Sequence, residues 1–167
     1  YTVTGWNSAY GAKIPVDEFV PVFGAYSEAP WTEHTERLPL SVHYVFNKIR
    51  NDTAIGKDLI SDVDEDGWRL PYEKYPFATC ELGGGIQVTY HRRPLISDMD
   101  IYALALVKLG SGNSLIGYYM YKGGTNKIGR LSALNESRAS GYPNDYPILS
   151  YDFQAPISEY GEVRGQY

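Results

Sequence analysis

The stretch Pro76-Phe77-Ala78-Thr79-Cys80-Glu81-Leu82-Gly83-Gly84-Gly85 runs from an apolar segment into a glycine-rich turn. We expect residues 75–80 to form a buried strand that delivers Glu81 to its carboxyl end. In α/β barrels and open α/β sheets, these strand ends and the loops after them form the active-site face. The glycines would let the backbone pass close to a bound ligand. This placement favours a catalytic or ligand-binding role for Glu81.

A structural interpretation of the same glutamate is also open. A carboxylate at a strand end can cap a neighbouring turn, or it can pair with Arg92 or Arg93 further along the chain. The stretch alone does not decide between the two roles, so the segments on either side matter.

The segment before the stretch predicts short, irregular elements. We expect a strand at 1–4 and an apolar run at 19–24, and the prolines at 15, 21 and 30 argue against a regular helix or a central strand there. Ser41 can cap a helix, because apolar side chains follow it at the 3.6-residue period, namely Val42, Val45, Phe46 and Ile49.

The segment after the stretch predicts a helix and a further strand. Ser97 caps a helix that runs to Leu109, with aspartates in its first turn and Gly110 beyond its end. This helix is apolar nearly all round, so we expect it to pack on a sheet on one side and on other elements on the other. A strand follows at 115–121. The order strand, helix, strand implies parallel pairing with a right-handed connection, and hence an α/β fold.

Composition is consistent with a domain that handles sugars. The chain has 167 residues, 43% of them hydrophobic, and 16 are tyrosine. A tyrosine ring can stack on a sugar while its hydroxyl bonds a sugar hydroxyl, although such rings also fill cores. The net charge is −5 and no basic cluster carries interleaved aromatic residues, so nucleic acid is not expected as a partner.

Metal, cofactor and cysteine chemistry are not expected. Cys80 is the single cysteine, so no internal disulfide can form, and we expect a small buried thiol. His34, His43 and His91 are far apart in sequence, and the acidic run at 62–66 reads as a solvated turn.

No signal peptide or membrane segment is apparent in the sequence. The chain opens at Tyr1 without a start methionine, so we expect it to begin in the middle of a longer protein.

Two later segments extend the pattern around Glu81. They are Tyr-Tyr-Met-Tyr-Lys-Gly-Gly-Thr-Asn at 118–126 and Ser-Tyr-Asp-Phe-Gln-Ala-Pro-Ile-Ser-Glu at 150–159. Together, and in this order, the three segments resemble glycoside hydrolase family 35, the retaining β-galactosidases. Tyr-His-Arg-Arg-Pro at 90–94 is similar to a His-rich, Arg-Pro stretch that follows the nucleophile in that family.

The resemblance implies a fold. It assigns the chain to the C-terminal part, about strands six to eight, of a (β/α)₈ TIM barrel. A complete barrel takes about 250 residues, so residues 1–167 would be a single partial catalytic-barrel domain and a fragment of a longer chain. The expected protein partner is the remainder of the barrel, or another copy that pairs across the exposed sheet edges.

The resemblance also implies a reaction. Glu81 would be the nucleophile of a retaining double displacement on terminal β-galactosides, in an oligosaccharide or polysaccharide. The family's acid/base glutamate leaves strand four in an Asn-Glu pair, and this chain would lack that strand, so we expect no acid/base residue here and an inactive isolated chain. Glu28 and Glu159 are weak local substitutes. We expect the full-length protein to be secreted or periplasmic.

Sugar contacts are implied by the same alignment of motifs. Tyr119, Tyr151, Phe153 and Asn126 match the strand-eight and downstream motifs, and Trp6 and Trp31 are candidates for a stacking wall. Lys122 stands where the family commonly has histidine. An alternative function is a non-catalytic carbohydrate-binding or scaffold protein derived from the same barrel.

Overall fold

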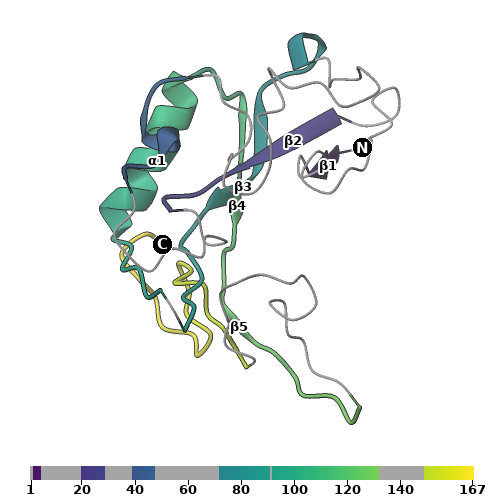
Figure 1. The fold of residues 1–167 in the computed structure, drawn as a ribbon, viewed down its shortest axis with the longest axis vertical. Helices are drawn as coiled ribbons and strands as arrows, with labels where there is room; N and C mark the ends of the chain where they lie inside the picture. Colours follow the sequence, from purple (N-terminus) through teal and green to yellow (C-terminus); the bar gives the residue numbers. More distant parts are fainter. Residues whose placement is uncertain (1, 5–19, 29–38, 48–71, 91, 132–148) are drawn as a thin grey trace.

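A computed structural model describes residues 2–4, 20–28, 39–47, 72–90, 92–131 and 149–167. Four strands form one parallel sheet in the order β1-β2-β3-β4 (Figure 1). Their bounds are β1 Thr2–Thr4, β2 Val20–Ala25, β3 Ala78–Gly83 and β4 Leu115–Tyr119. The predicted parallel pairing is therefore confirmed, and the sheet order follows the order of the chain.

Smaller elements complete the described part of the chain. Helix α1 spans Asp98–Gly110 and connects β3 to β4. Two short 3-10 turns occur at Val42–Tyr44 and Tyr72–Lys74. The strands β5, Gly124–Thr125, and β6, Ser150–Tyr151, pair antiparallel in a separate two-stranded sheet. No described helix is long and apolar enough to cross a membrane.

Helix α1 begins as its sequence predicts. The Ser97 hydroxyl accepts a hydrogen bond from the Asp100 backbone N–H, and the Asp100 carboxylate accepts one from the Ser97 N–H, which is a reciprocal capping box. The end differs by one residue, since Gly110 is the last helical residue. Gly112 carries the left-handed backbone with φ of +92°.

The helix packs on the sheet through a small apolar core. Leu104 is fully buried and contacts Leu82 of β3 and Ala25 of β2, with Ile116 and Ala105 packed against them. Burying a leucine of this kind contributes about 2–3 kcal/mol. This core fixes which face of the sheet is covered by α1.

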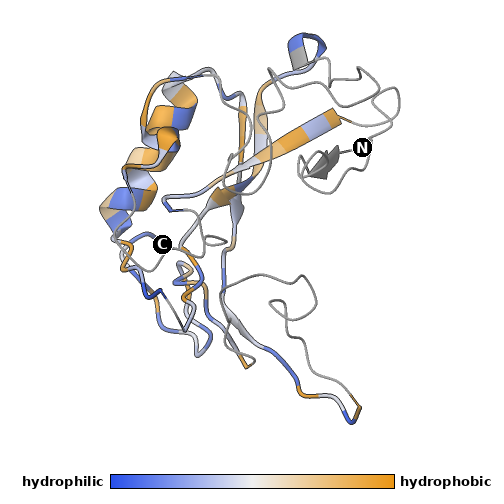
Figure 2. Ribbon diagram, in the orientation of Figure 1, coloured by the Kyte–Doolittle hydropathy of each residue, from blue (hydrophilic) through white to orange (hydrophobic). Residues whose placement is uncertain are grey.

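One side of α1 is largely exposed in the described part of the chain. Four large side chains on it are between 53 and 64% exposed, namely Met99, Tyr102, Leu106 and Leu109. The helix also packs against the 3-10 turn at Val42–Tyr44, where the Tyr44 hydroxyl donates to the Asp100 carbonyl. The prediction that it packs on a sheet and on other elements is therefore confirmed. Figure 2 shows hydrophobic residues along α1 and β2, whereas the segments beyond β4 are mostly hydrophilic.

Two sequence predictions in the first half of the chain are wrong. Pro21 lies in β2, which pairs with β1 on one side and β3 on the other, although its proline argued against a central strand. The pairing with β3 begins only at Phe23, so Pro21 lies before the point where β2 is paired on both sides.

The helix expected after Ser41 is instead a 3-10 turn. Ser41 does cap it, accepting from the His43 N–H, but Val45 is already extended, with φ of −111° and ψ of 141°. The Asn47 N–H donates to the Ser111 hydroxyl, and its amide donates to the Val42 carbonyl. These contacts take the place of helical hydrogen bonds. Residues 48–52, the expected end of the helix, lie outside the described residues.

Strand β3 carries one extra residue relative to both neighbours. Thr79 and Glu81 lie opposite consecutive residues of β2, Phe23 and Gly24. Against β4, Thr79 pairs with Ile116 and Leu82 pairs with Tyr118. The chain therefore advances three residues along β3 but only two along β4. The extra residue is a β-bulge at Cys80–Glu81, which breaks the alternation of faces.

Candidate active site

The bulge in β3 decides where the Glu81 side chain lies. Leu82 belongs to the core under α1, and its register partners on that face are Ala25 and Tyr118. Glu81 lies opposite Gly24 in β2, on the other face of the sheet. Glu81 is thus within the strand, because β3 extends to Gly83, three residues beyond the end that the sequence predicts.

Tyr26, just past the end of β2, holds the carboxylate of Glu81. Its hydroxyl donates a hydrogen bond to Glu81 Oε2 at 3.1 Å. The Tyr26 side chain is 1% exposed, and burial, followed by the nearby charge of Glu81, raises the pKa of its phenol far above the ordinary value. The phenol therefore stays protonated and is a permanent donor to the carboxylate.

Three tyrosines gather around one buried phenylalanine beside this pair. The Phe153 ring lies 6.0 Å from that of Tyr26, 5.2 Å from Tyr119 and 5.8 Å from Tyr151, between centroids. The hydroxyls of Tyr119 and Tyr151 share a hydrogen bond of 2.8 Å. Phe153 is 5% exposed, so its ring packs against the three tyrosine rings from the protein interior. We call these four side chains the aromatic cluster.

The glycines after Glu81 make room for protein atoms. A Cβ at Gly83 would lie 2.8 Å from the Tyr26 ring, and one at Gly84 would lie 2.8 Å from the Met120 carbonyl oxygen. At Gly85 it would collide with the carbonyl groups of Phe153 and Gln154. The sequence predicted that these glycines let a ligand approach the backbone. In the structure, other parts of the chain occupy the space beside them.

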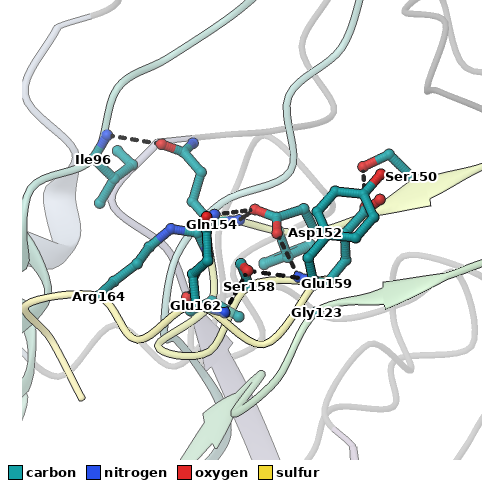
Figure 3. Close-up of polar contacts among 12 residues, drawn as sticks. Ile96, Gly123, Ser150, Asp152, Gln154, Ser158, Glu159, Glu162 and Arg164 are labelled. Atoms are coloured by element: carbon teal, nitrogen blue, oxygen red, sulfur yellow. Dashed lines mark hydrogen bonds and ion pairs between the residues drawn. The ribbon is translucent and has the colours of Figure 1, made fainter.

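Residues 150–159 hold the aromatic cluster through a dense set of polar contacts (Figure 3). Asp152 Oδ1 accepts from the Arg164 guanidinium at 2.6 Å and from the Gln154 N–H at 3.1 Å, while Oδ2 accepts from the Glu159 N–H at 2.8 Å. The Ser158 hydroxyl accepts from the Glu162 N–H. Asp152 and Ser158 thus hold the backbone of this segment in place beneath the Tyr151 and Phe153 rings.

Gln87 and Gln154 join this segment to the loop after β3. Gln87 Oε1 accepts from the Phe153 N–H, and its amide nitrogen donates to the Ser150 carbonyl. The Gln154 amide donates to the carbonyls of Ile86 and Pro94. Phe153 and Gln154 have positive φ, 59° and 47°, a region that non-glycine residues rarely adopt. The hydrogen bonds at both residues support that backbone.

The other carboxylates considered as catalysts have structural partners. Glu28 forms a 2.6 Å ion pair with Arg92, one of the two arginines considered as alternative partners for Glu81. Glu159 Oε2 accepts from the Ser150 hydroxyl at 2.5 Å.

The expectation of no acid/base residue overlooked one Asn-Glu pair, the dipeptide that carries the acid/base glutamate in the family resemblance. This pair, Asn135-Glu136, follows the motif at 118–126, whereas the strand-four glutamate would precede Glu81, and it lies outside the described residues.

The structure describes only some of the other residues that were predicted to contact the sugar. The Asn126 N–H donates to the Leu149 carbonyl beside β5. The Lys122 ammonium donates to the carbonyls of Gly123 and Glu159. Trp6 and Trp31 lie outside the described residues.

Cys80 is half-buried beside Glu81. Burial, with the adjacent carboxylate as the second cause, raises the pKa of the thiol from 9.0 to about 11. The thiol is therefore protonated at neutral pH and is a poor nucleophile.

No described group of three or more His, Cys, Asp and Glu side chains could hold a metal ion. His34, His91 and the acidic run at 62–66 lie outside the described residues.

Similar sequences occur among known glycosyl hydrolases. The sequence profile of glycosyl hydrolases family 35 matches residues 9–167. A relative, beta-galactosidase 10 of Arabidopsis thaliana, is 46% identical over 55 residues, which is 33% of this chain. The aligned stretch spans 6% of that relative's length.

Proposed function

The chain belongs to glycosyl hydrolases family 35, and we propose that it provides the nucleophile half of the active site of a retaining β-galactosidase. The observation that carries the proposal is the Tyr26–Glu81 hydrogen bond at the carboxyl ends of neighbouring parallel strands. Active sites of α/β barrels occupy this end of the sheet. The relative named beta-galactosidase 10 supports the choice of substrate.

We propose a defined role for each side chain. Glu81 attacks the anomeric carbon while the glycosidic C–O bond breaks, and the aglycone leaves with a proton from the acid/base residue; water then hydrolyses the covalent glycosyl intermediate. The Tyr26 phenol fixes Oε2 of the carboxylate and keeps the group oriented during attack. Tyr119 and Tyr151, linked by their 2.8 Å hydrogen bond, present hydroxyls to the galactoside. Phe153 holds both rings in place from the buried side.

The four parallel strands are proposed as the last part of a (β/α)₈ barrel, with the acid/base residue on another part of it. Retaining glycosidases need a second carboxyl group about 5–5.5 Å from the nucleophile. The ion pair of Glu28 and the short hydrogen bond of Glu159 argue against either as that group. Residues 1–167 would then be one partial catalytic domain.

Trapping the covalent intermediate tests the proposal. The protein containing the complete barrel would be incubated with a 2-deoxy-2-fluoro-β-galactoside, and the labelled peptide identified by mass spectrometry. We expect the label on Glu81, its loss in Glu81→Gln, and its retention in the control Glu159→Gln. Proton NMR of the first-formed sugar should show the β-anomer. A label on another carboxylate, or an α-anomer from the β-substrate, would contradict the assignment.

The alternative proposal is a carbohydrate-binding or scaffold protein without turnover. It is favoured by the structural use of Glu28 and Glu159 described above. Binding of a β-galactoside by the complete protein, with neither turnover nor a trapped intermediate, would support this alternative over catalysis.

A further inference from the structure

A cavity of about 520 Å³ lies on the face of the sheet opposite Glu81. One wall comes from helix α1 and includes Ile101, Tyr102 and Ala105. The other wall comes from β4 and the C-terminal segment, and includes Tyr118, Pro156 and Gln166. The volume is within the range of about 300–1,000 Å³ that is typical of small-molecule sites.

The register of the sheet separates this cavity from the proposed active site. Tyr118 pairs with Leu82, which belongs to the core under α1, whereas the next residue, Tyr119, belongs to the aromatic cluster beside Glu81. Successive side chains of a strand point to opposite faces. The two tyrosines therefore serve different faces of the sheet, and a ligand in the cavity would not reach Glu81.

The lining of the cavity is aromatic and largely exposed. Four tyrosines contribute to it, and each is between 51 and 67% exposed, namely Tyr102, Tyr118, Tyr121 and Tyr167. The rings of Tyr121 and Tyr167 lie 5.9 Å apart at 40°, and their hydroxyls are joined at 3.3 Å. This pair forms an aromatic platform with polar groups along its edge.

Polar groups of two kinds complete the cavity. The Asp98 carboxylate, at the start of α1, is an acceptor, and its Oδ1 caps the Met99 N–H. The Gln166 amide nitrogen is held in place by the carbonyls of Gly84 and Gln154, which orients the amide. Tyrosine rings suit the apolar faces of sugar rings, while carboxylate, amide and phenol groups suit their hydroxyls.

We propose that this cavity is a second saccharide-binding site that takes a neutral oligosaccharide of two or three sugar units. Among the described residues, no lysine or arginine lines the cavity, so an anionic ligand is not favoured. The open aromatic platform and the few fixed polar groups fit a ligand that is held by stacking and by hydroxyl contacts. The site binds without turnover and does not depend on Glu81 being a nucleophile.

Titration with lactose tests the site. In ¹H–¹⁵N spectra of the 167-residue chain, we expect lactose to shift the Gln166 side-chain amide and the Gly165 backbone amide. Tyr102→Ala should weaken binding about tenfold, because it removes one stacking ring. The matched control is Tyr160→Ala, an exposed tyrosine outside the cavity. It should leave the affinity unchanged.

The Glu81→Gln variant separates this site from the proposed function. If the cavity binds lactose, Glu81→Gln retains the Gln166 shift while it removes trapping in the complete protein. Should Tyr102→Ala fail to fold, Tyr121→Ala removes a ring of the aromatic platform on the other wall and tests the same cavity. Lactose shifts confined to the aromatic cluster, or no shift at tens of millimolar lactose, would overturn the proposal.

Discussion

The Tyr26 hydroxyl and Glu81 Oε2 are joined at 3.1 Å although the two residues are 55 positions apart in the sequence. Their contact depends on the pairing of β2 with β3 and on the extra residue in β3. A buried, protonated phenol is thus fixed against the one carboxylate that the sequence singles out.

Replacing Tyr26 by phenylalanine should reduce activity without unfolding the protein. The ring that packs on Phe153 remains, but the donor to the carboxylate is lost. A hydrogen bond to a charged group contributes about 1.5–3 kcal/mol, so we expect kcat/KM of the complete enzyme to fall about 10- to 100-fold. The control is Tyr44→Phe, which removes a hydroxyl bonded to the Asp100 carbonyl. Equal activity in Tyr26→Phe and Tyr44→Phe would contradict the role given to Tyr26.

The isolated 167-residue chain should not hydrolyse an aryl β-galactoside. It has the proposed nucleophile, but the proposed barrel places the acid/base carboxyl group elsewhere. The rate of nitrophenol release, followed by absorbance, should match a buffer blank. Turnover well above the blank that Glu81→Gln abolishes would show that the chain holds both catalytic groups.

A methyl group at Gly85 should destabilise the fold. The added Cβ would meet the backbone carbonyls of Phe153 and Gln154, which cannot turn away as a flexible side chain can. Overpacking of this kind costs about 1–3 kcal/mol, so Gly85→Ala should lower the urea midpoint. Gly124→Ala is the control, since nothing lies within 4 Å of its added Cβ. A midpoint for Gly85→Ala that equals the control would refute this explanation of the glycine run.

Truncating Asp152 should loosen the support of the aromatic cluster. Its carboxylate accepts from the Arg164 guanidinium and from two backbone N–H groups, at Gln154 and Glu159. Losing these contacts should cost about 2 kcal/mol in the free energy of unfolding, measured by urea denaturation. Glu162→Ala is the control, because the Glu162 backbone N–H and carbonyl make its hydrogen bonds with Ser158. A loss no larger than that of the control would mean that the segment is held by other contacts.

Alkylation of Cys80 should be slow at neutral pH. The thiol is half-buried, and its pKa is raised to about 11 by burial and by the charge of Glu81. Since only the thiolate reacts, the iodoacetamide rate in the folded chain should rise with a midpoint near pH 11. The urea-unfolded chain should show a midpoint about two units lower, near the ordinary value. If the alkylation rates of the folded and the unfolded chain had the same pH midpoint, the Cys80 thiol would be exposed to solvent in the folded chain.

Local signals in the sequence were sufficient for several elements. The Ser97 capping box marks the start of helix α1, and the apolar residues that follow predict a helix rather than a strand. The strand before Glu81 and its parallel pairing with β4 follow from the apolar run and from the connecting helix. These features depend on residues within a few positions of one another.

Features that depend on distant residues were missed. Tyr26 could have been found by the rule that selected Glu81, because it also lies directly after a buried strand. Nothing local marks it as the partner of Glu81, since that contact requires the register of two strands. After Ser41 the periodicity favoured a helix, but contacts of Asn47 with Ser111 and Val42 hold another backbone.

The bulge at Cys80–Glu81 makes the pairing register of β3 as important as its composition. Thr79 pairs with Ile116, which packs against the core under α1, so a strand of the same sequence without the bulge would turn the carboxylate of Glu81 toward Leu104. Deletion of Cys80 would instead restore regular alternation and leave Glu81 on its present face. Substitutions at Cys80 are thus constrained to side chains that tolerate the bulge.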